Sequence, residues 1–353
     1  MKTRNTYFNS NIFNFFVFFT YILLSSGCIE QINYDVSTEK DRIVISGLIT
    51  SSFESQVVQV KRSILTGSGN LTNSTPIVNA EVKISSSTNS FTFSHTTDGN
   101  YTALFSAIPN EEYVLEVTVG ENMYRSSPQK MPQPQPMLNA KSNLIQKQSL
   151  NSSGNLVNNQ FVSVSLDGNI STNLKVIYRV FGQYEFMEFN PPSTMQKTCY
   201  VNDQIDNNTI KLLSANDLRT TAIENYNILE VPFDARFLRM YAFRIFQYTI
   251  SDASFSYWNK IRQVTNAGEN LFDAPPGKII GNIRNISNPK DEVLGNFTLG
   301  ATSSTIVFTN MVQLGSVVND VCQVRFNTAR PPICIDCLRI PESSTTKPSY
   351  WPQ

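Results

Sequence analysis

The sequence predicts a mostly β protein, with an N-terminal β-sandwich followed by a larger antiparallel β domain that carries one or two short helices. Three observations support this fold class. Apolar and polar residues alternate with a period of two, as in half-buried antiparallel strands. Turn-forming residues separate these segments at short intervals. The composition is only 16% charged and is 11% aromatic, which favours a folded β protein over a disordered chain.

The first 27 residues have the order of a secretory signal peptide. Lys2 and Arg4 supply positive charge, and an apolar run follows that is short for a transmembrane helix. The run ends in Leu-Ser-Ser-Gly-Cys at residues 24–28, which resembles the end of a bacterial lipoprotein signal. We therefore expect residues 1–27 to be the signal peptide and Cys28 to be the lipidation site. The alternative is an ordinary signal peptide that leaves Cys28 free or disulfide-bonded.

Cysteine usage agrees with lipidation. The chain has five cysteines, an odd number for an exported protein. Assigning Cys28 to a lipid leaves an even set, and in an oxidising envelope we expect that set to form structural disulfides. The four disulfide candidates are Cys199, Cys322, Cys334 and Cys337. Four cysteines allow three connectivities, and of these we predict Cys199–Cys322 with Cys334–Cys337.

The first folded domain is expected at residues 43–126, after a polar, lipid-anchored tether at residues 28–42. Its strands are expected within residues 56–64, 80–85 and 113–119, where apolar residues alternate with polar ones. The segments VNAEVKISS, TTDGNYTALF and EEYVLEVTVG follow in that order. Together they resemble the prealbumin-like (carboxypeptidase-regulatory-like) β-sandwich, an Ig-like arrangement of two sheets.

A proline-rich connector is expected at residues 127–137. Four prolines in SSPQKMPQPQPM cannot sustain a helix or a sheet ladder, so this segment should be extended. As an extended connector it is also expected to be an early protease site near residues 131–137.

Residues 138–353 are expected to form the larger β-rich domain, with a disulfide-bearing C-terminal tail. Its strands are expected within residues 161–169, 174–189, 239–250 and 304–314. Between the last two, residues 251–265 predict an amphipathic helix, with Ser251 or Asp252 as its N-cap. The apolar residues expected to pack on the sheet recur every three positions: Phe255, Trp258, Ile261 and Val264.

The sequence gives little indication of catalysis or of nucleic-acid binding. Acidic and basic residues both number 28, so the formal charge is zero and no basic stripe points to nucleic acid. The only histidine, His95, is more consistent with a strand edge or turn than with a catalytic base. We therefore predict no enzyme activity, no cofactor and no metal. A metal or sugar site formed by Asp273, Asn282 and Asp291 is the less favoured alternative to a structural role.

The pair Cys334 and Cys337 could also be a redox motif or part of a zinc site. A redox Cys-x-x-Cys pair usually begins a helix, whereas prolines on both sides indicate a loop here. Zinc would require two further good ligands. Structural disulfides are the preferred interpretation.

The C-terminal third contains an ordered succession of motifs: YWNKIRQ, then NLFDAPPGKIIGNI and LGNFTLGATSST, and finally CIDCLRIPESSTTKPSYW. With the lipoprotein cysteine and the first sandwich, this succession resembles an uncharacterised family of Bacteroidota outer-membrane lipoproteins, classed as a domain of unknown function. The resemblance runs from Cys28 to Trp351. The resemblance implies that the gene lies beside a gene for a TonB-dependent outer-membrane transporter.

These observations lead to three functional expectations. The first is a non-enzymatic, lipid-anchored outer-membrane protein, exposed on the cell surface, that serves as an accessory or cargo-capturing subunit of a TonB-dependent (SusC-like) transporter. The second is a structural subunit of an outer-membrane assembly or secretion complex. The third is a surface adhesin or glycan-binding module. The expected partner is an outer-membrane β-barrel protein, and no nucleic-acid partner is expected.

Overall fold

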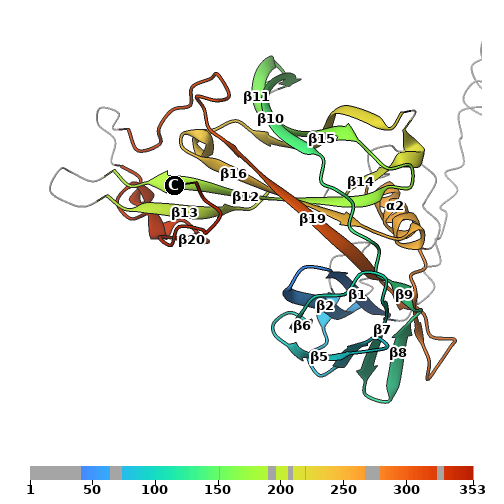
Figure 1. The fold of residues 1–353 in the computed structure, drawn as a ribbon. Helices are drawn as coiled ribbons and strands as arrows, with labels where there is room; N and C mark the ends of the chain where they lie inside the picture. Colours follow the sequence, from blue (N-terminus) through green and yellow to red (C-terminus); the bar gives the residue numbers. More distant parts are fainter. Residues whose placement is uncertain are drawn as a thin grey trace, which may run out of the picture.

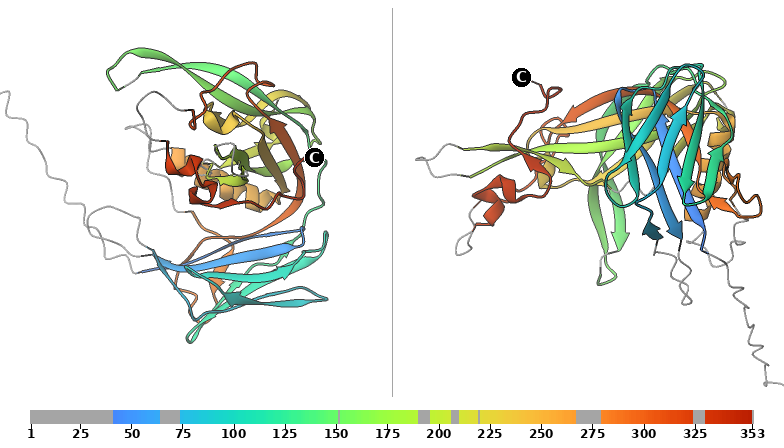
Figure 2. Two further views of the ribbon diagram at one scale, coloured as in Figure 1. Left: turned by 90° about the vertical axis from the view of Figure 1, so that its left-hand side faces the viewer. Right: turned by 90° about the horizontal axis from the view of Figure 1, so that it is seen from below.

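The computed structural model describes residues 41–63, 74–150, 152–189, 196–205, 210–218, 220–266, 279–323 and 330–352. The prediction of a mostly β protein is confirmed. The chain forms two β-rich modules that lie one above the other in Figure 1 and in the left view of Figure 2. No helix in these described ranges has the length and hydrophobicity needed to cross a membrane.

The first sandwich is built mainly from the N-terminal strands. These are β1 (Ile43–Thr50), β2 (Glu54–Ser63), β3 (Ser74–Pro76), β4 (Glu81–Ser85), β5 (Ser90–His95), β6 (Asn100–Phe105), β7 (Glu112–Val119), β8 (Asn122–Ser126) and β9 (Gln129–Lys130). One sheet contains β1, β2, β3 and β6, and the other contains β4, β7 and β8. Strand β5 pairs with β4 at one end and with β6 at the other, so it joins the two sheets.

The core of the first sandwich follows the alternation in the sequence. Val58 and Val60 of β2, Ile84 of β4, and Leu115 and Val117 of β7 are fully buried between the two sheets. The polar residues between them face outward, as a period of two requires for a sheet with one buried face.

Three C-terminal segments complete this sandwich. Strand β17 (Ile283–Asn285) pairs with β8, and both β18 (Val293–Leu294) and the first part of β19 (Phe297–Thr309) pair in parallel with β1. The sequence-based division placed all of residues 138–353 in the second domain, whereas the structure returns residues 283–300 to the first. Parallel pairing across some 250 residues leaves no local sequence signal, which explains the difference.

Gly295 makes this return possible. Its φ is +96°, a conformation that L-residues with a side chain rarely adopt, and an added Cβ would lie 2.0 Å from the carbonyl oxygen of Ile45. The backbone at Gly295 therefore passes β1 more closely than any side chain allows.

The second module has two sheets of its own. One contains β12 (Lys175–Met187), β13 (Thr198–Asp203), β14 (Lys211–Ser214), β16 (Tyr241–Thr249), β20 (Ser343–Ser344) and the second part of β19. The other contains β10 (Asn139–Leu150), β11 (Leu156–Asn169) and β15 (Ala222–Pro232). The core between them includes Val164, Val180, Phe243 and Ile245, all nearly or fully buried. Short 3-10 helices lie in the connections: η1 (Ala215–Asp217), η2 (Ala235–Phe237), η4 (Pro332–Cys334) and η5 (Cys337–Arg339).

Strand β19 belongs to both modules. Residues 297–300 pair with β1 of the first sandwich, and residues 301–309 pair with β16 of the second module. Figure 1 shows this strand running without a break from one module into the other. The modules are therefore joined by continuous β structure and not only by a linker.

The proline-rich connector is also held in place. Met131 is fully buried in the core of the first sandwich, and its N–H donates to Glu111 O at 2.9 Å. Further along, Gln135 O accepts from Gln247 Nε2 at 3.1 Å and from Ser303 Oγ at 2.6 Å. The connector is extended, as predicted, but the exposed chain that an early protease site requires is not present at Met131.

Helix α2 (Asp252–Asn266) lies where the sequence predicts a helix. Ser251 caps it, because its Oγ accepts from Ser254 N at 3.2 Å. Phe255 is buried, but Val264, which was expected to pack on the sheet, is 36% exposed. An α-helix has 3.6 residues per turn, so residues spaced by three shift steadily around the helix axis. Val264 is nine residues after Phe255 and therefore lies about 180° away from it around the axis. Only the first two turns therefore face the sheet.

Candidate functional site

The four described cysteines form two disulfides, Cys199–Cys337 and Cys322–Cys334. The predicted pairing of Cys199 with Cys322 and of Cys334 with Cys337 is wrong. The Cα–Cα distances of 6.0 Å and 5.5 Å lie in the range that a disulfide requires. Proximity in sequence favoured the Cys-x-x-Cys bridge, but tertiary structure decides the pairing.

Strand pairing in the tail explains this connectivity. Strand β20 pairs with β13, so the chain just before β20 lies beside β13. That places Cys337, at the start of η5, next to Cys199 of β13. Cys334, at the end of η4, pairs with Cys322. The Cys199–Cys337 bridge links the C-terminal tail to β13 of the second module, and the Cys322–Cys334 bridge joins two points 12 residues apart in the chain after β19.

A buried carboxylate supports the docked tail. The side chain of Glu188 is fully buried, and it accepts from Cys337 N at 3.0 Å and from Lys197 N at 3.3 Å. Burial by itself raises the pKa of this carboxyl. The two backbone N–H groups and the Lys197 ammonium more than offset that effect, so the pKa of Glu188 lies below its ordinary value. Glu188 is therefore a structural anion that ties the tail to β12.

Of the remaining residues singled out in the sequence, those that the structure describes make local structural contacts. Cys28 and Asp273 lie outside the described residues. Asn282 uses its amide to bond both backbone groups of Phe297, at 2.7 and 2.8 Å, and Asp291 accepts from Asn285 Nδ2 at 3.1 Å. His95 is exposed at the end of β5, with its ring edge-on to Tyr101. Within the described ranges, no three His, Cys, Asp or Glu side chains gather as metal ligands do.

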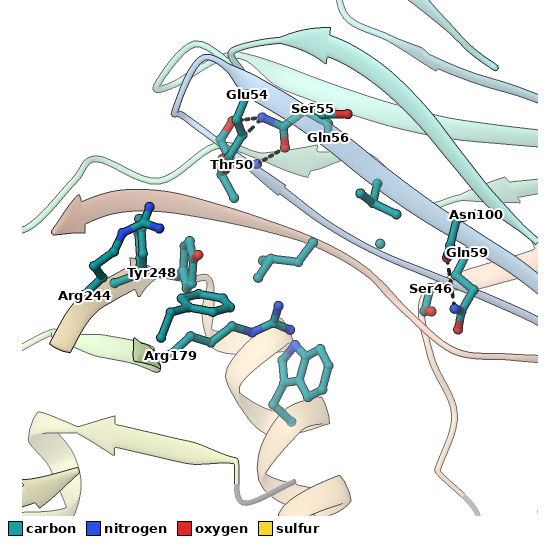
Figure 3. Close-up of a pocket in the computed structure, with 16 residues that line it drawn as sticks. Ser46, Thr50, Glu54, Ser55, Gln56, Gln59, Asn100, Arg179, Arg244 and Tyr248 are labelled. Atoms are coloured by element: carbon teal, nitrogen blue, oxygen red, sulfur yellow. Dashed lines mark hydrogen bonds between the residues drawn. The ribbon is translucent and has the colours of Figure 1, made fainter. Parts of the chain in front are cut away.

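The structure instead reveals a cleft of about 550 Å³ between the two modules (Figure 3). One wall is the outer face of β1 and β2 of the first sandwich. The other is the face of β12 and β16 that points away from the core of the second module, with α2 at one end. The lining residues on which its chemistry depends are Glu54, Gln56, Gln59, Asn100, Arg179, Phe181, Arg244, Phe246, Tyr248 and Trp258.

The β12–β16 register arranges four of these side chains as a checkerboard. Arg179 lies opposite Phe246, and Phe181 lies opposite Arg244. Their neighbours on either side, such as Val180, point into the core on the reverse face. Alternation along two paired strands thus builds one surface on which arginines occupy one diagonal and phenylalanines the other.

Aromatic contacts hold this surface together. The rings of Phe181 and Phe246 meet edge-to-face with their centroids 5.6 Å apart. The Arg244 guanidinium carbon lies 5.5 Å from the Phe246 centroid and 5.0 Å from that of Tyr350, which belongs to the docked tail. Such cation–π contacts orient a guanidinium without neutralising it. The tail thereby holds Arg244 in position at the edge of the cleft.

The electrostatics of the cleft favour a negatively charged ligand. Neither Arg179 nor Arg244 forms an ion pair with any carboxylate in the described part of the chain. On the facing wall, the Glu54 carboxylate accepts a hydrogen bond from Thr50 Oγ1. Burial raises the pKa of Tyr248 to about 12, so its hydroxyl stays neutral at physiological pH. The lining of the cleft therefore carries two arginines and only one glutamate.

The facing wall is otherwise neutral and well ordered. Gln56 is buried and its amide bonds the backbone on both sides, accepting from Thr50 N at 2.8 Å and donating to Phe105 O at 3.0 Å. Gln59 Nε2 donates to Asn100 Oδ1 at 3.0 Å. Figure 3 shows these amides across the cleft from the two arginines. Shared β19 and the bound connector fix the two walls relative to each other, so the cleft is preformed.

Sequence reasoning missed this cleft. The strands at residues 174–189 and 239–250 were predicted, but the surface formed by the polar residues on their second face was not. The available signal was an Arg-x-Phe triplet in each strand, at residues 179–181 and 244–246. Trp258 was predicted to pack in the core. Trp258 does pack against a small apolar cluster that includes Phe255 and Tyr248, and its Nε1 donates to Thr298 Oγ1 at 3.1 Å. It also lines the cleft.

Comparison with known proteins gives one match. The model of one protein family covers residues 29–306, and the family's description reads "Domain of unknown function (DUF4249)". Searches of curated proteins and of solved structures gave no match.

Proposed function

The chain belongs to this family, and from that premise we propose that it is a non-enzymatic, lipid-anchored outer-membrane protein that captures cargo for a TonB-dependent transporter. The observation that carries the proposal is the preformed cleft. Its volume of about 550 Å³ lies within the range of small-molecule sites. Its lining combines aromatic rings with arginines that have no ion-pair partner among the described residues.

The anchor is the second part of the proposal. Cys28 follows a lipoprotein-like signal, and twelve residues separate it from Asp41, the first described residue. An extended chain of that length spans a few tens of ångströms, at about 3.3–3.6 Å per residue. Such a tether lets the folded modules stand above the membrane surface and reach the rim of a neighbouring barrel.

A structural subunit of an outer-membrane assembly is the second candidate. It is favoured by apolar side chains exposed at one end of the first sandwich, where β1 ends and β2 begins. Phe53 is 73% exposed, Leu104 is 65% exposed and Ile108 is 50% exposed. Exposed apolar groups that cluster together often mark contacts with another protein.

Affinity purification of the tagged full-length chain from detergent-solubilised outer membranes tests the proposal. A TonB-dependent β-barrel should co-purify in near-equal amount and be identified by mass spectrometry. If a different assembly co-purifies instead, Phe53→Ser combined with Leu104→Ser should weaken that association, whereas Leu150→Ser, at the exposed tip of the β10–β11 hairpin, serves as the matched control. Recovery of the chain without any transporter would contradict the proposal, and recovery of a different assembly would favour the second candidate.

A further inference from the structure

We infer that the cleft takes a small organic ligand with two acidic groups, one bound by Arg179 and one by Arg244, on either side of an apolar body. The inference rests on the proposed function, because it names the ligand class of the same cleft. It is carried by the geometry of the checkerboard and by the charge of the surrounding residues.

The first argument is that both guanidiniums are available. No carboxylate in the described ranges forms an ion pair with either, and Arg179 is an exposed residue. Some other arginines of the described chain are paired: Arg236 contacts Asp203 and Asp234, and Arg125 contacts Glu116. The planar guanidinium binds carboxylate, sulfate or phosphate through two parallel hydrogen bonds. Two arginines without an ion pair on one wall of the cleft therefore favour an anionic ligand.

The second argument is the spacing. Arg179 and Arg244 occupy one diagonal of an antiparallel strand pair. Diagonal neighbours have their Cα atoms about 7–8 Å apart. Phe181 and Phe246 occupy the other diagonal of the same four positions. A ligand that lies on these two rings can therefore present one acidic group to each arginine.

The third argument concerns the body between the two charges. Phe181 and Phe246 occupy the other diagonal, and Phe181 is 41% exposed. A planar or apolar ligand body placed between the guanidiniums therefore lies on the aromatic rings. Its burial contributes to the binding free energy in proportion to the apolar area removed from water. Gln59 and Asn100 on the facing wall are neutral. The one carboxylate that lines this wall, Glu54, accepts a hydrogen bond from Thr50 Oγ1.

Titration calorimetry of the purified full-length protein in detergent tests the inference. The probe is terephthalate, which carries carboxylates at opposite ends of a benzene ring. Terephthalamide is the neutral probe of the same shape, and benzoate carries one acid only. Terephthalate should bind, benzoate should bind about tenfold more weakly, and terephthalamide should show no binding. Added salt should weaken terephthalate binding, because the contact is ionic and open to solvent.

Three variants and one control variant locate the site. Arg179→Gln and Arg244→Gln should each weaken terephthalate binding about tenfold or more, and Arg179→Lys, which keeps the charge but loses the fork, should have a smaller effect. Arg125→Gln removes an equal charge from β8, outside the cleft, and should leave the affinity unchanged. Thermal unfolding of each variant checks that the fold is retained.

Absence of terephthalate binding, equal binding of terephthalamide, or unchanged affinity in both Arg→Gln variants would overturn the inference. The titration uses the purified protein alone, so its outcome does not depend on a transporter. Failure of co-purification with a transporter and failure of this titration are therefore separate results.

Discussion

Replacing Gly295 with alanine should destabilise the protein strongly. The added Cβ would lie 2.0 Å from Ile45 O and 2.7 Å from Ile45 C, both backbone atoms that cannot rotate away. The φ of +96° adds a strain of about 1–2 kcal/mol for an L-residue. Overpacking against a fixed neighbour typically adds about 1–3 kcal/mol. The expected loss of unfolding free energy is therefore about 2–5 kcal/mol.

Gly120→Ala is the matched control. Gly120 has a φ of +58°, and nothing lies within 4 Å of the Cβ that alanine would add. That variant therefore measures the backbone strain alone. Urea unfolding followed by tryptophan fluorescence gives both losses under the same conditions. If the two variants lose the same free energy, the close approach of Gly295 to β1 contributes nothing and the reasoning is refuted.

Three further outcomes can be measured. Glu188→Gln should lower the free energy of unfolding at neutral pH and make that free energy fall less steeply in acid. The pKa of Glu188 in the folded state lies below the unfolded value of about 4.3. The carboxylate therefore contributes its full stabilisation above the unfolded pKa, and this stabilisation is lost as the pH falls through the folded pKa. Stability measured from pH 7 to pH 3 checks this, and an unchanged pH profile would contradict it. Cys28→Ser should release the protein from the membrane fraction, and retention of an acylated product would refute the anchor. Peptide mapping without reductant should recover two bridged pairs and no free thiol among them: Cys199–Cys337 and Cys322–Cys334.

Features that depend on neighbouring residues could be predicted from the sequence. Alternation placed Val58 and Val60 in the core, and the Ser251 cap marked the start of α2. The same local reasoning failed at Val264, because a three-residue spacing does not keep to one face of an α-helix.

Features that depend on distant contacts could not be predicted. The return of β17, β18 and β19 to the first sandwich, and the pairing of Cys199 with Cys337, are decided by which strands become neighbours. The cleft belongs to the same class. Each Arg-x-Phe triplet is unremarkable alone, and only the register of β12 with β16 sets Arg179 and Arg244 on one diagonal.

The continuity of β19 has a mechanical consequence for the lipid-anchored state proposed above. Tension from the membrane would enter the fold at Ile43, where β1 begins. Strand β1 pairs with β2 on one side and with β18 and β19 on the other, along nearly its whole length. A pull along β1 therefore loads these hydrogen bonds together, in shear, and passes the force into β19 and on to β16. The cleft walls should keep their spacing under load, because the strand that bears the force also joins them.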